Sequence, residues 1–146
     1  MLRKFLVALM LVLLAACGGD GTGVEEEPGS TGSLAPSGPL VVLLRYGGIA
    51  GSNDRVSVDA LGVATVISDR SDSSSTRTLS PSDLAALRSA LRRADIKSLR
   101  RNYLDRQARD AYQYDVTYEG VTVTADEGVI PEKLRPVVDQ LTKLIR

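Results

Sequence analysis

Histidine is absent from this 146-residue sequence, and cysteine occurs once, at position 17. Histidine is the side chain that most often serves as a general acid or base near neutral pH. Its absence excludes Cys–His and Ser–His nucleophilic systems and nearly every zinc or haem site. Paired carboxylates would still suffice for some reactions, but no spacing in the sequence points to such a pair. The composition therefore predicts a protein that is not an enzyme and carries no cofactor or metal.

Nucleotide-binding and calcium-binding motifs are also missing. The sequence has no P-loop, no dinucleotide fingerprint and no EF-hand loop. The glycine-rich stretch over residues 47–51 lacks the spacing of a dinucleotide loop, and no phosphate-binding helix pattern follows it. Acidic and basic residues are balanced at 18 each, so no global attraction to nucleic acid is expected.

What the sequence does contain, at its start, is a sorting signal. Arg3 and Lys4 precede an unbroken apolar run over residues 5–16, which is too short to cross a membrane and is typical of a secretory signal peptide. The run ends in Leu14-Ala15-Ala16-Cys17, which resembles the lipobox of bacterial lipoproteins. That resemblance implies that residues 1–16 are removed and that Cys17 carries a diacylglycerol with acyl chains such as palmitate.

The lipobox also implies a place and a first partner. A doubly acylated Cys17 would anchor the protein stably to membrane lipid. The protein is then expected in the cell envelope, on the extracytoplasmic side of its membrane. Loss of Arg3 and Lys4 with the signal peptide leaves 16 basic residues against 18 acidic ones, a net charge of −2.

Composition divides the rest of the chain into a tether and a domain. Residues 17–39 are rich in glycine, serine, threonine and proline, which cannot bury a core and predict a flexible tether. Residues 40–146 are long enough for one small domain. Since no cysteine lies in that domain, packing rather than disulfides must stabilise it.

The first half of the domain is patterned for strands. A buried strand is expected over residues 40–46, and a hairpin over residues 56–60 and 63–67. The serine-rich segment 69–76 is expected to be a mobile loop. A short strand over residues 77–79 is a further possibility that the pattern leaves open.

Two helices and a second hairpin complete the pattern. Ser80, Pro81 and Asp83 form a strong helix start, with serine at the N-cap and proline at the first helical position. Alternation over residues 111–118 and a turn at Glu119-Gly120 predict the hairpin. A final helix is interrupted near its start by Pro136.

These elements predict an α+β domain, an antiparallel β-sheet of four to six strands with both helices packed on one face. The tyrosines of segment 111–118 either lie under the helices or form an exposed stripe on the open face. Val116, Val121 and Val123 share the alternating pattern of the tyrosines, which favours the first arrangement.

The domain resembles emfourin, a family of small protein inhibitors of thermolysin-like zinc metalloproteases. Four segments carry the resemblance: 45–51 (RYGGIAG), 79–84 (LSPSDL), 112–118 with 121–123 (YQYDVTY and VTV), and 131–138 (PEKLRPVV). In the family an aromatic residue is common at the position of Ile49. The resemblance implies a secreted metalloprotease as partner. The competing hypothesis is a non-enzymatic interaction lipoprotein of the envelope with no protease target.

The resemblance also directs attention to two candidate contact loops. Thermolysin-like clefts accept a bulky apolar residue, and Ile49 lies in such a position between Gly47-Gly48 and Ala50-Gly51. The alternative is that these glycines only shape a hairpin while Ile49 caps the core. In the second loop, Asp126 and Glu127 either approach a zinc ion held by the partner or form a solvated acidic turn.

Topology decides whether the two loops could act together. If residues 77–79 form a strand, counting the reversals of chain direction between successive strands places segments 47–53 and 126–130 at the same end of the sheet. Otherwise the two segments lie at opposite ends.

Eight basic residues fall within segment 88–109. Export makes nucleic acid an improbable partner for them. The segment therefore faces anionic headgroups, an acidic partner or plain solvent.

Overall fold

The computed structural model describes residues 38–70 and 72–145. The expected signal peptide, the expected lipidation site Cys17 and nearly all of the expected tether lie outside the described residues. Within the described residues, no helix combines the length and the apolar character needed to span a membrane.

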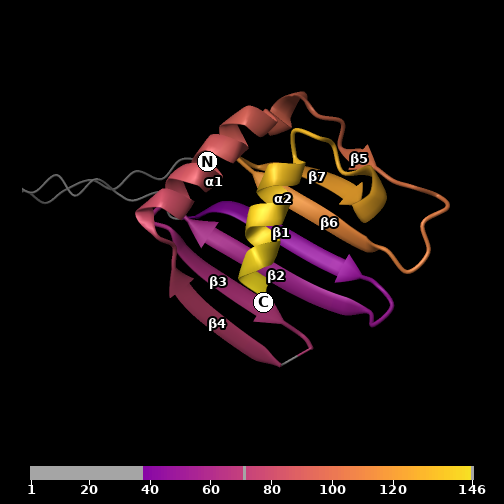
Figure 1. Cartoon of the computed structure of the whole chain (residues 1–146), viewed down its shortest axis with the longest axis horizontal. Helices are drawn as coiled ribbons and strands as arrows, with labels where there is room; N and C mark the ends of the chain where they lie inside the picture. Colours follow the sequence, from indigo (N-terminus) through magenta and orange to yellow (C-terminus); the bar gives the residue numbers. More distant parts are fainter. Residues whose placement is uncertain (1–37, 71, 146) are drawn as a thin grey trace, which may run out of the picture. The chain divides into compact units, whose positions relative to one another are not determined.

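The elements follow one another as two β-hairpins, a helix, a third hairpin and a second helix (Figure 1). Their bounds are β1 Pro39–Gly47, β2 Ser52–Asp59, β3 Val63–Ser68, β4 Ser73–Thr78, α1 Pro81–Ala94, η1 Ile96–Ser98, β5 Asn102–Tyr103, β6 Tyr112–Tyr118, β7 Val121–Asp126, η2 Glu127–Val129, α2 Arg135–Thr142 and η3 Lys143–Ile145.

All the strands described belong to one seven-stranded sheet, in the order β4-β3-β2-β1-β6-β7-β5. Neighbouring strands pair antiparallel except β5, which runs parallel to β7 over two residue pairs. The α+β architecture is as predicted, with more strands than the expected four to six. The additions are β4 as a full strand and the short β5.

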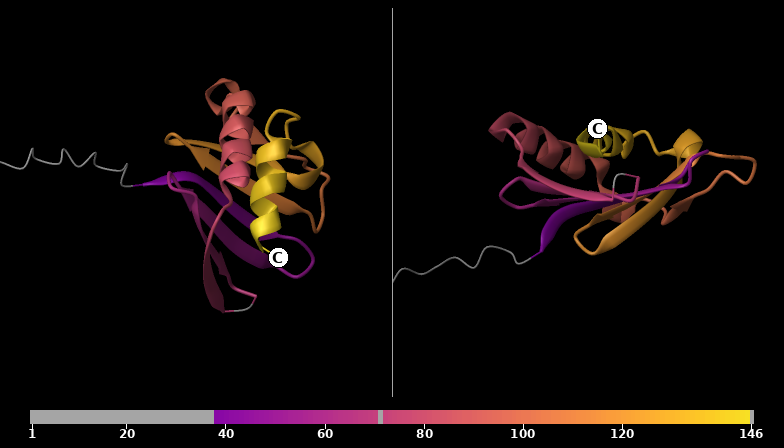
Figure 2. Two further views of the ribbon diagram at one scale, coloured as in Figure 1. Left: turned by 60° about the vertical axis from the view of Figure 1, so that its left-hand side comes forward. Right: turned by 90° about the horizontal axis from the view of Figure 1, so that it is seen from below.

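Both helices cover the same face of the sheet, as the edge-on view in Figure 2 shows. The core between them is almost entirely aliphatic. Helix α1 contributes Leu87 and Leu91, α2 contributes Leu141, and β1 meets them with Val41 and Leu43. Each of these leucines stabilises the fold by roughly 1.5–3 kcal/mol through removal from water.

The start and end of α1 follow from its terminal residues. Ser80 is the N-cap, and its Oγ accepts a hydrogen bond from the backbone N–H of Asp83 at 3.1 Å. Pro81 opens the helix, where its missing N–H costs nothing. Asp95 ends it in the left-handed region with φ of 45°. The expected start is therefore confirmed, and Pro136 likewise lies in the first turn of α2.

The segment expected to be a mobile loop forms an edge strand, so that expectation is wrong from Ser73 onward. Strand β4 pairs with β3 from Ser73 to Thr78, although all of its side chains are exposed. Backbone hydrogen bonds to β3 make this segment a strand. Because none of its side chains is buried, no hydrophobic periodicity marks the strand in the sequence. A short polar edge strand also protects the sheet from pairing with other chains.

The tyrosines of β6 lie on the helix face, as favoured. Tyr114 is buried in the core beside Val116, and Tyr112 and Tyr118 pack against its margin. Burial raises the pKa of the Tyr114 phenol above its ordinary value, with a further contribution from Glu127. The turn at Glu119-Gly120 has positive φ at both residues, as the hairpin predicted.

The sheet has two ends that differ in character, here called the tether end and the tip end. Strand β1 begins at Pro39 at the tether end, which also carries the turns 60–62 and 119–120. The tip end carries the loops 48–51, 69–72 and 104–111 together with η2. In Figure 1 the tip end lies to the right of the sheet.

Candidate binding surface at the tip end

Ile49 stands at the tip of the β1–β2 hairpin with 92% of its surface exposed. It therefore does not cap the core, which was the alternative left open by the sequence. Single exposed apolar side chains are common on protein surfaces, so exposure alone does not mark a binding site. The conformation of the loop that carries Ile49 must therefore be considered.

Glycines shape this loop and hold it against the neighbouring strand. Gly47, Gly48 and Gly51 have φ of 92°, 70° and 60°, a region that favours glycine. The backbone N–H of Gly48 donates to the carbonyl of Ala111 at 3.0 Å, and that of Gly51 donates to the carbonyl of Gly48 at 3.0 Å. Ile49 is thus presented by a closed turn that is fastened to the segment before β6.

We expect Gly48→Ala to be more damaging than Gly51→Ala, although both residues have positive φ. A Cβ at Gly48 would lie 2.8 Å from Cε1 of Tyr112, whereas a Cβ at Gly51 would meet nothing within 4 Å. Both changes cost about 1–2 kcal/mol of backbone strain, and the clash adds about 1 kcal/mol at Gly48. Urea denaturation of the two variants measures the difference. Equal losses would show that Tyr112 does not support the loop.

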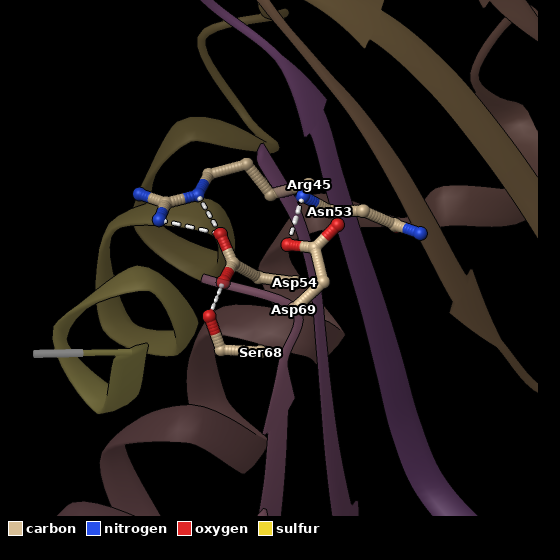
Figure 3. Close-up of polar contacts among 5 residues, drawn as sticks. All are labelled: Arg45, Asn53, Asp54, Ser68 and Asp69. Atoms are coloured by element: carbon tan, nitrogen blue, oxygen red, sulfur yellow. Dashed lines mark hydrogen bonds and ion pairs between the residues drawn. The ribbon is translucent and has the colours of Figure 1, made fainter. Parts of the chain in front are cut away.

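The base of the hairpin is held by a buried ion pair (Figure 3). Nε and Nη2 of Arg45 donate to Oδ2 of Asp54 at 3.0 and 2.6 Å, and Ser68 Oγ donates to the other oxygen of Asp54. The Arg45 guanidinium also lies 4.7 Å from the centre of the Tyr112 ring, a cation–π contact. These contacts join β1, β2, β3 and β6 just beneath the loop.

The carboxyl of Asp54 is only 1% exposed, so its charge depends on these partners. Burial acts to raise its pKa, but the hydrogen bonds from Ser68 and Arg45 and the charge of Arg45 outweigh burial. The pKa of Asp54 therefore lies below its ordinary value, and the side chain is an anion at neutral pH.

Asp69, which follows β3, is tied to β2 by a reciprocal contact. The backbone N–H of Asn53 donates to Oδ1 of Asp69 at 2.8 Å, and the N–H of Asp69 donates to the carbonyl of Asn53 at 3.3 Å. Figure 3 shows Asp69 reaching back to Asn53 beside the ion pair. Asp69 therefore has a structural role at the tip end.

Asp126, a predicted contact residue, is placed inside the domain with 9% exposure. One oxygen accepts from Nε2 of Gln113 at 2.6 Å and the other from the backbone N–H of Asp105 at 2.7 Å. The Tyr46 hydroxyl donates to the oxygen of the Gln113 amide and so orients it. Asp126 thus fastens loop 104–111 over the end of β7, and it neither forms a solvated turn nor points toward a partner.

Glu127, the other acidic candidate, is exposed at the start of η2. Its Oε2 accepts a long hydrogen bond of 3.5 Å from the backbone N–H of Tyr112. Since Tyr112 pairs with Gly47, this contact places η2 close to the base of the β1–β2 hairpin. The two predicted loops therefore lie at the same end of the sheet, as the strand alternative required.

Two further apolar side chains stand at this end and were not identified from the sequence. Leu104 is 56% exposed in loop 104–111, and Val129 is 39% exposed at the end of η2. Together with Ile49 they form what we call the apolar rim. In the sequence Leu104 is a single leucine near charged residues, and no hydrophobic periodicity marks it.

The basic segment 88–109 does not form one surface. Arg88 in α1 donates from Nη2 to the carbonyl of Ala60 at 2.6 Å, which places it at the tether end. Arg106 and Arg109 belong to loop 104–111 at the tip end. A single binding face for all eight basic residues is therefore absent.

Two hollows lined by described residues include no residue of the apolar rim, although the second reaches the tip end at Asp69. One, of about 480 Å³, lies between α1, η3 and the end of β4, and includes Leu79, Leu87 and Leu144. The other, of about 600 Å³, lies on the uncovered sheet face and includes Leu44, Arg55 and Ile67. Neither hollow includes a residue of the β1–β2 loop.

Comparisons with family models, with curated proteins and with solved structures found no match. Among the residues with described positions, no group of three or more acidic or cysteine side chains is arranged to hold a metal ion.

Proposed function

We propose that this chain is a membrane-anchored lipoprotein whose emfourin-like domain inhibits a thermolysin-like metalloprotease with the Ile49 loop. The observation that carries the proposal is the 92% exposure of Ile49 on a turn that is closed by glycines and fastened at its base. The domain acts as a binding protein and contributes no catalytic group.

The physical basis of inhibition is presentation of an already ordered loop. Because the turn is held by Ala111 and by the Arg45–Asp54 pair, little conformational entropy is lost when it enters a cleft. Full burial of Ile49 in an apolar subsite contributes roughly 1.5–3 kcal/mol. Leu104 and Val129 offer secondary apolar contacts around the cleft.

The anchor belongs to the same proposal. Cys17, at the end of a lipobox-like sequence, carries the lipid, and residues 18–38 connect it to β1. The domain then works in the cell envelope on the extracytoplasmic side, where it meets secreted proteases.

A second candidate is an envelope interaction lipoprotein that binds a partner other than a protease. The apolar rim favours this alternative equally, because exposed Ile49, Leu104 and Val129 would serve any partner with a complementary apolar surface. The two candidates differ in whether protease active sites compete for Ile49.

Titration of the mature protein against a panel of thermolysin-like proteases tests the main proposal. We expect inhibition of at least one protease at submicromolar concentration, competitive with a peptide substrate. Serine proteases of similar substrate preference provide the control and should be unaffected. Absence of inhibition across the panel at micromolar protein would reject the protease as target and leave the second candidate.

A further inference from the structure

The tether end of the domain is the end at which the chain enters the sheet. The chain reaches β1 there, at Pro39, after residues 18–38. If those residues form the flexible tether that their composition predicts, they span about 25 Å on average. If Cys17 is lipidated, as proposed above, the tether end is the part of the domain held nearest to the membrane surface.

An exposed leucine projects from this end. Leu61 is 71% exposed in the β2–β3 turn. Asp59 fixes the turn, because its Oδ1 accepts from the backbone N–H groups of Leu61 and Val63, each at 2.8 Å. Leu61 thus lies largely in solvent on a turn that is closed by the side chain of Asp59.

Two arginines of α1 lie on the same side of the domain as that leucine. Arg88 reaches the carbonyl of Ala60 at 2.6 Å, directly beside Leu61. Arg92 lies one helical turn further on the same side of α1, near Tyr118 at the end of β6. Both side chains are exposed, and neither forms an ion pair with a residue that the structure describes.

Two acidic groups at the tether end already have partners within the domain. Glu119 forms an ion pair with Lys97, with Oε2 and Nζ 2.7 Å apart. Asp59 is engaged by the backbone of its own turn. Arg88 and Arg92 remain as exposed cations beside this turn, without an ion-pair partner among the described residues.

We propose that the tether end docks on an anionic phospholipid surface, with Leu61 inserted at the headgroup boundary and Arg88 and Arg92 on the phosphates. A lipid surface is favoured over a protein partner because the proposed anchor delivers this end, and no other, to the membrane. An exposed apolar side chain beside cations is the composition that binds membrane interfaces. The proposal rests on the lipid anchor of the proposed function.

Docking of the tether end would orient the tip end relative to the membrane. Strand β1 runs from Pro39 to Gly47, about 30 Å at the usual rise per residue. The apolar rim then faces away from the membrane, toward soluble proteins. The chain from the proposed anchor enters β1 at one end, and the Ile49 loop follows the other end of that strand. Neither therefore obstructs the other.

Site-specific labelling of the lipidated protein on vesicles tests the docking. In the variant Leu61→Cys the introduced thiol is the only free one, because Cys17 is acylated, and it can carry a bimane fluorophore. The vesicles are phosphatidylcholine with brominated acyl chains, with or without phosphatidylglycerol. We expect bromine quenching at position 61 only when phosphatidylglycerol is present, and none for the same label in Ile49→Cys.

Charge variants supply the matched comparison. Arg88→Gln with Arg92→Gln should lower the ratio of docked to undocked protein about 30-fold, since each well-placed cation contributes about a fivefold factor. Arg106→Gln with Arg109→Gln, which removes the same charge from the tip end, should leave the ratio unchanged. Equal quenching at positions 61 and 49, or quenching that ignores phosphatidylglycerol, would overturn the proposal.

The anchor is checked separately by the mass of the N-terminal peptide. An unmodified Cys17 would reject the lipoprotein proposal. Docking would then be measured with Cys17→Ser and the label at position 61, at saturating vesicle concentration. Quenching by anionic vesicles would support docking without the anchor, and its absence would overturn it.

Discussion

Replacing Asp54 by alanine is expected to lower the free energy of unfolding by about 3 kcal/mol, because the Arg45 guanidinium would lose its partner where little water reaches it. The same change removes the acceptor for Ser68. The contacts that join β1, β2 and β3 beneath the Ile49 loop would be lost together. Urea denaturation measures the loss, and the loop should become sensitive to proteases before the core does.

The exposed pair Lys97–Glu119 provides a control for Asp54→Ala. Its atoms are as close, 2.7 Å apart, but its side chains are 65% and 50% exposed. Glu119→Gln should therefore leave the urea midpoint unchanged, since solvent screens such a pair. Equal effects of the two variants would contradict the structural role given to Asp54.

Acid provides a second check on Asp54. Its pKa in the folded protein lies below the unfolded value of about 3.9. A group with a lowered folded pKa contributes stability that is fully present above the unfolded pKa and is lost as the pH falls through the folded pKa. The difference between wild type and Asp54→Ala should therefore be constant near neutral pH and shrink below pH of about 4.

The parts of the fold that the sequence predicted are those with a strong local signal. Ser80 and Pro81 marked the start of α1 because capping and a fixed φ act within one turn. The hairpin at Glu119-Gly120 was marked by alternation and a turn glycine. Strand β4 had no such signal, since its serines and threonines form a strand only because β3 offers a free edge.

The candidate site likewise contains a residue whose role could be predicted from local sequence and residues whose roles could not. Exposure of Ile49 could be proposed from its flanking glycines, because their conformation is a local property. The burial of Asp126 could not, since it depends on Gln113 and on loop 104–111, which contact it only in the folded sheet. Leu104 joins the apolar rim for the same reason: the pairing of β5 with β7 brings it to the tip end.

Replacing Ile49 by aspartate is expected to weaken inhibition of the target protease at least about 100-fold. The variant loses an apolar side chain and must place a carboxylate in an apolar subsite, which together cost about 3 kcal/mol or more. Stability should change by less than about 0.5 kcal/mol, because Ile49 is 92% exposed and contributes little to the core. The inhibition constant and the urea midpoint are measured on the same preparation.

Leu61→Asp is the matched control for Ile49→Asp. Leu61 is also an exposed apolar residue in a hairpin turn, but it lies at the tether end. In solution, without vesicles, this variant should inhibit as the wild type does. If both variants inhibit normally, the protease remains the target but its binding does not use the Ile49 loop, and the site proposed here is rejected. If Ile49→Asp alone unfolds the domain, the loop supports the core and cannot serve as a detachable contact surface.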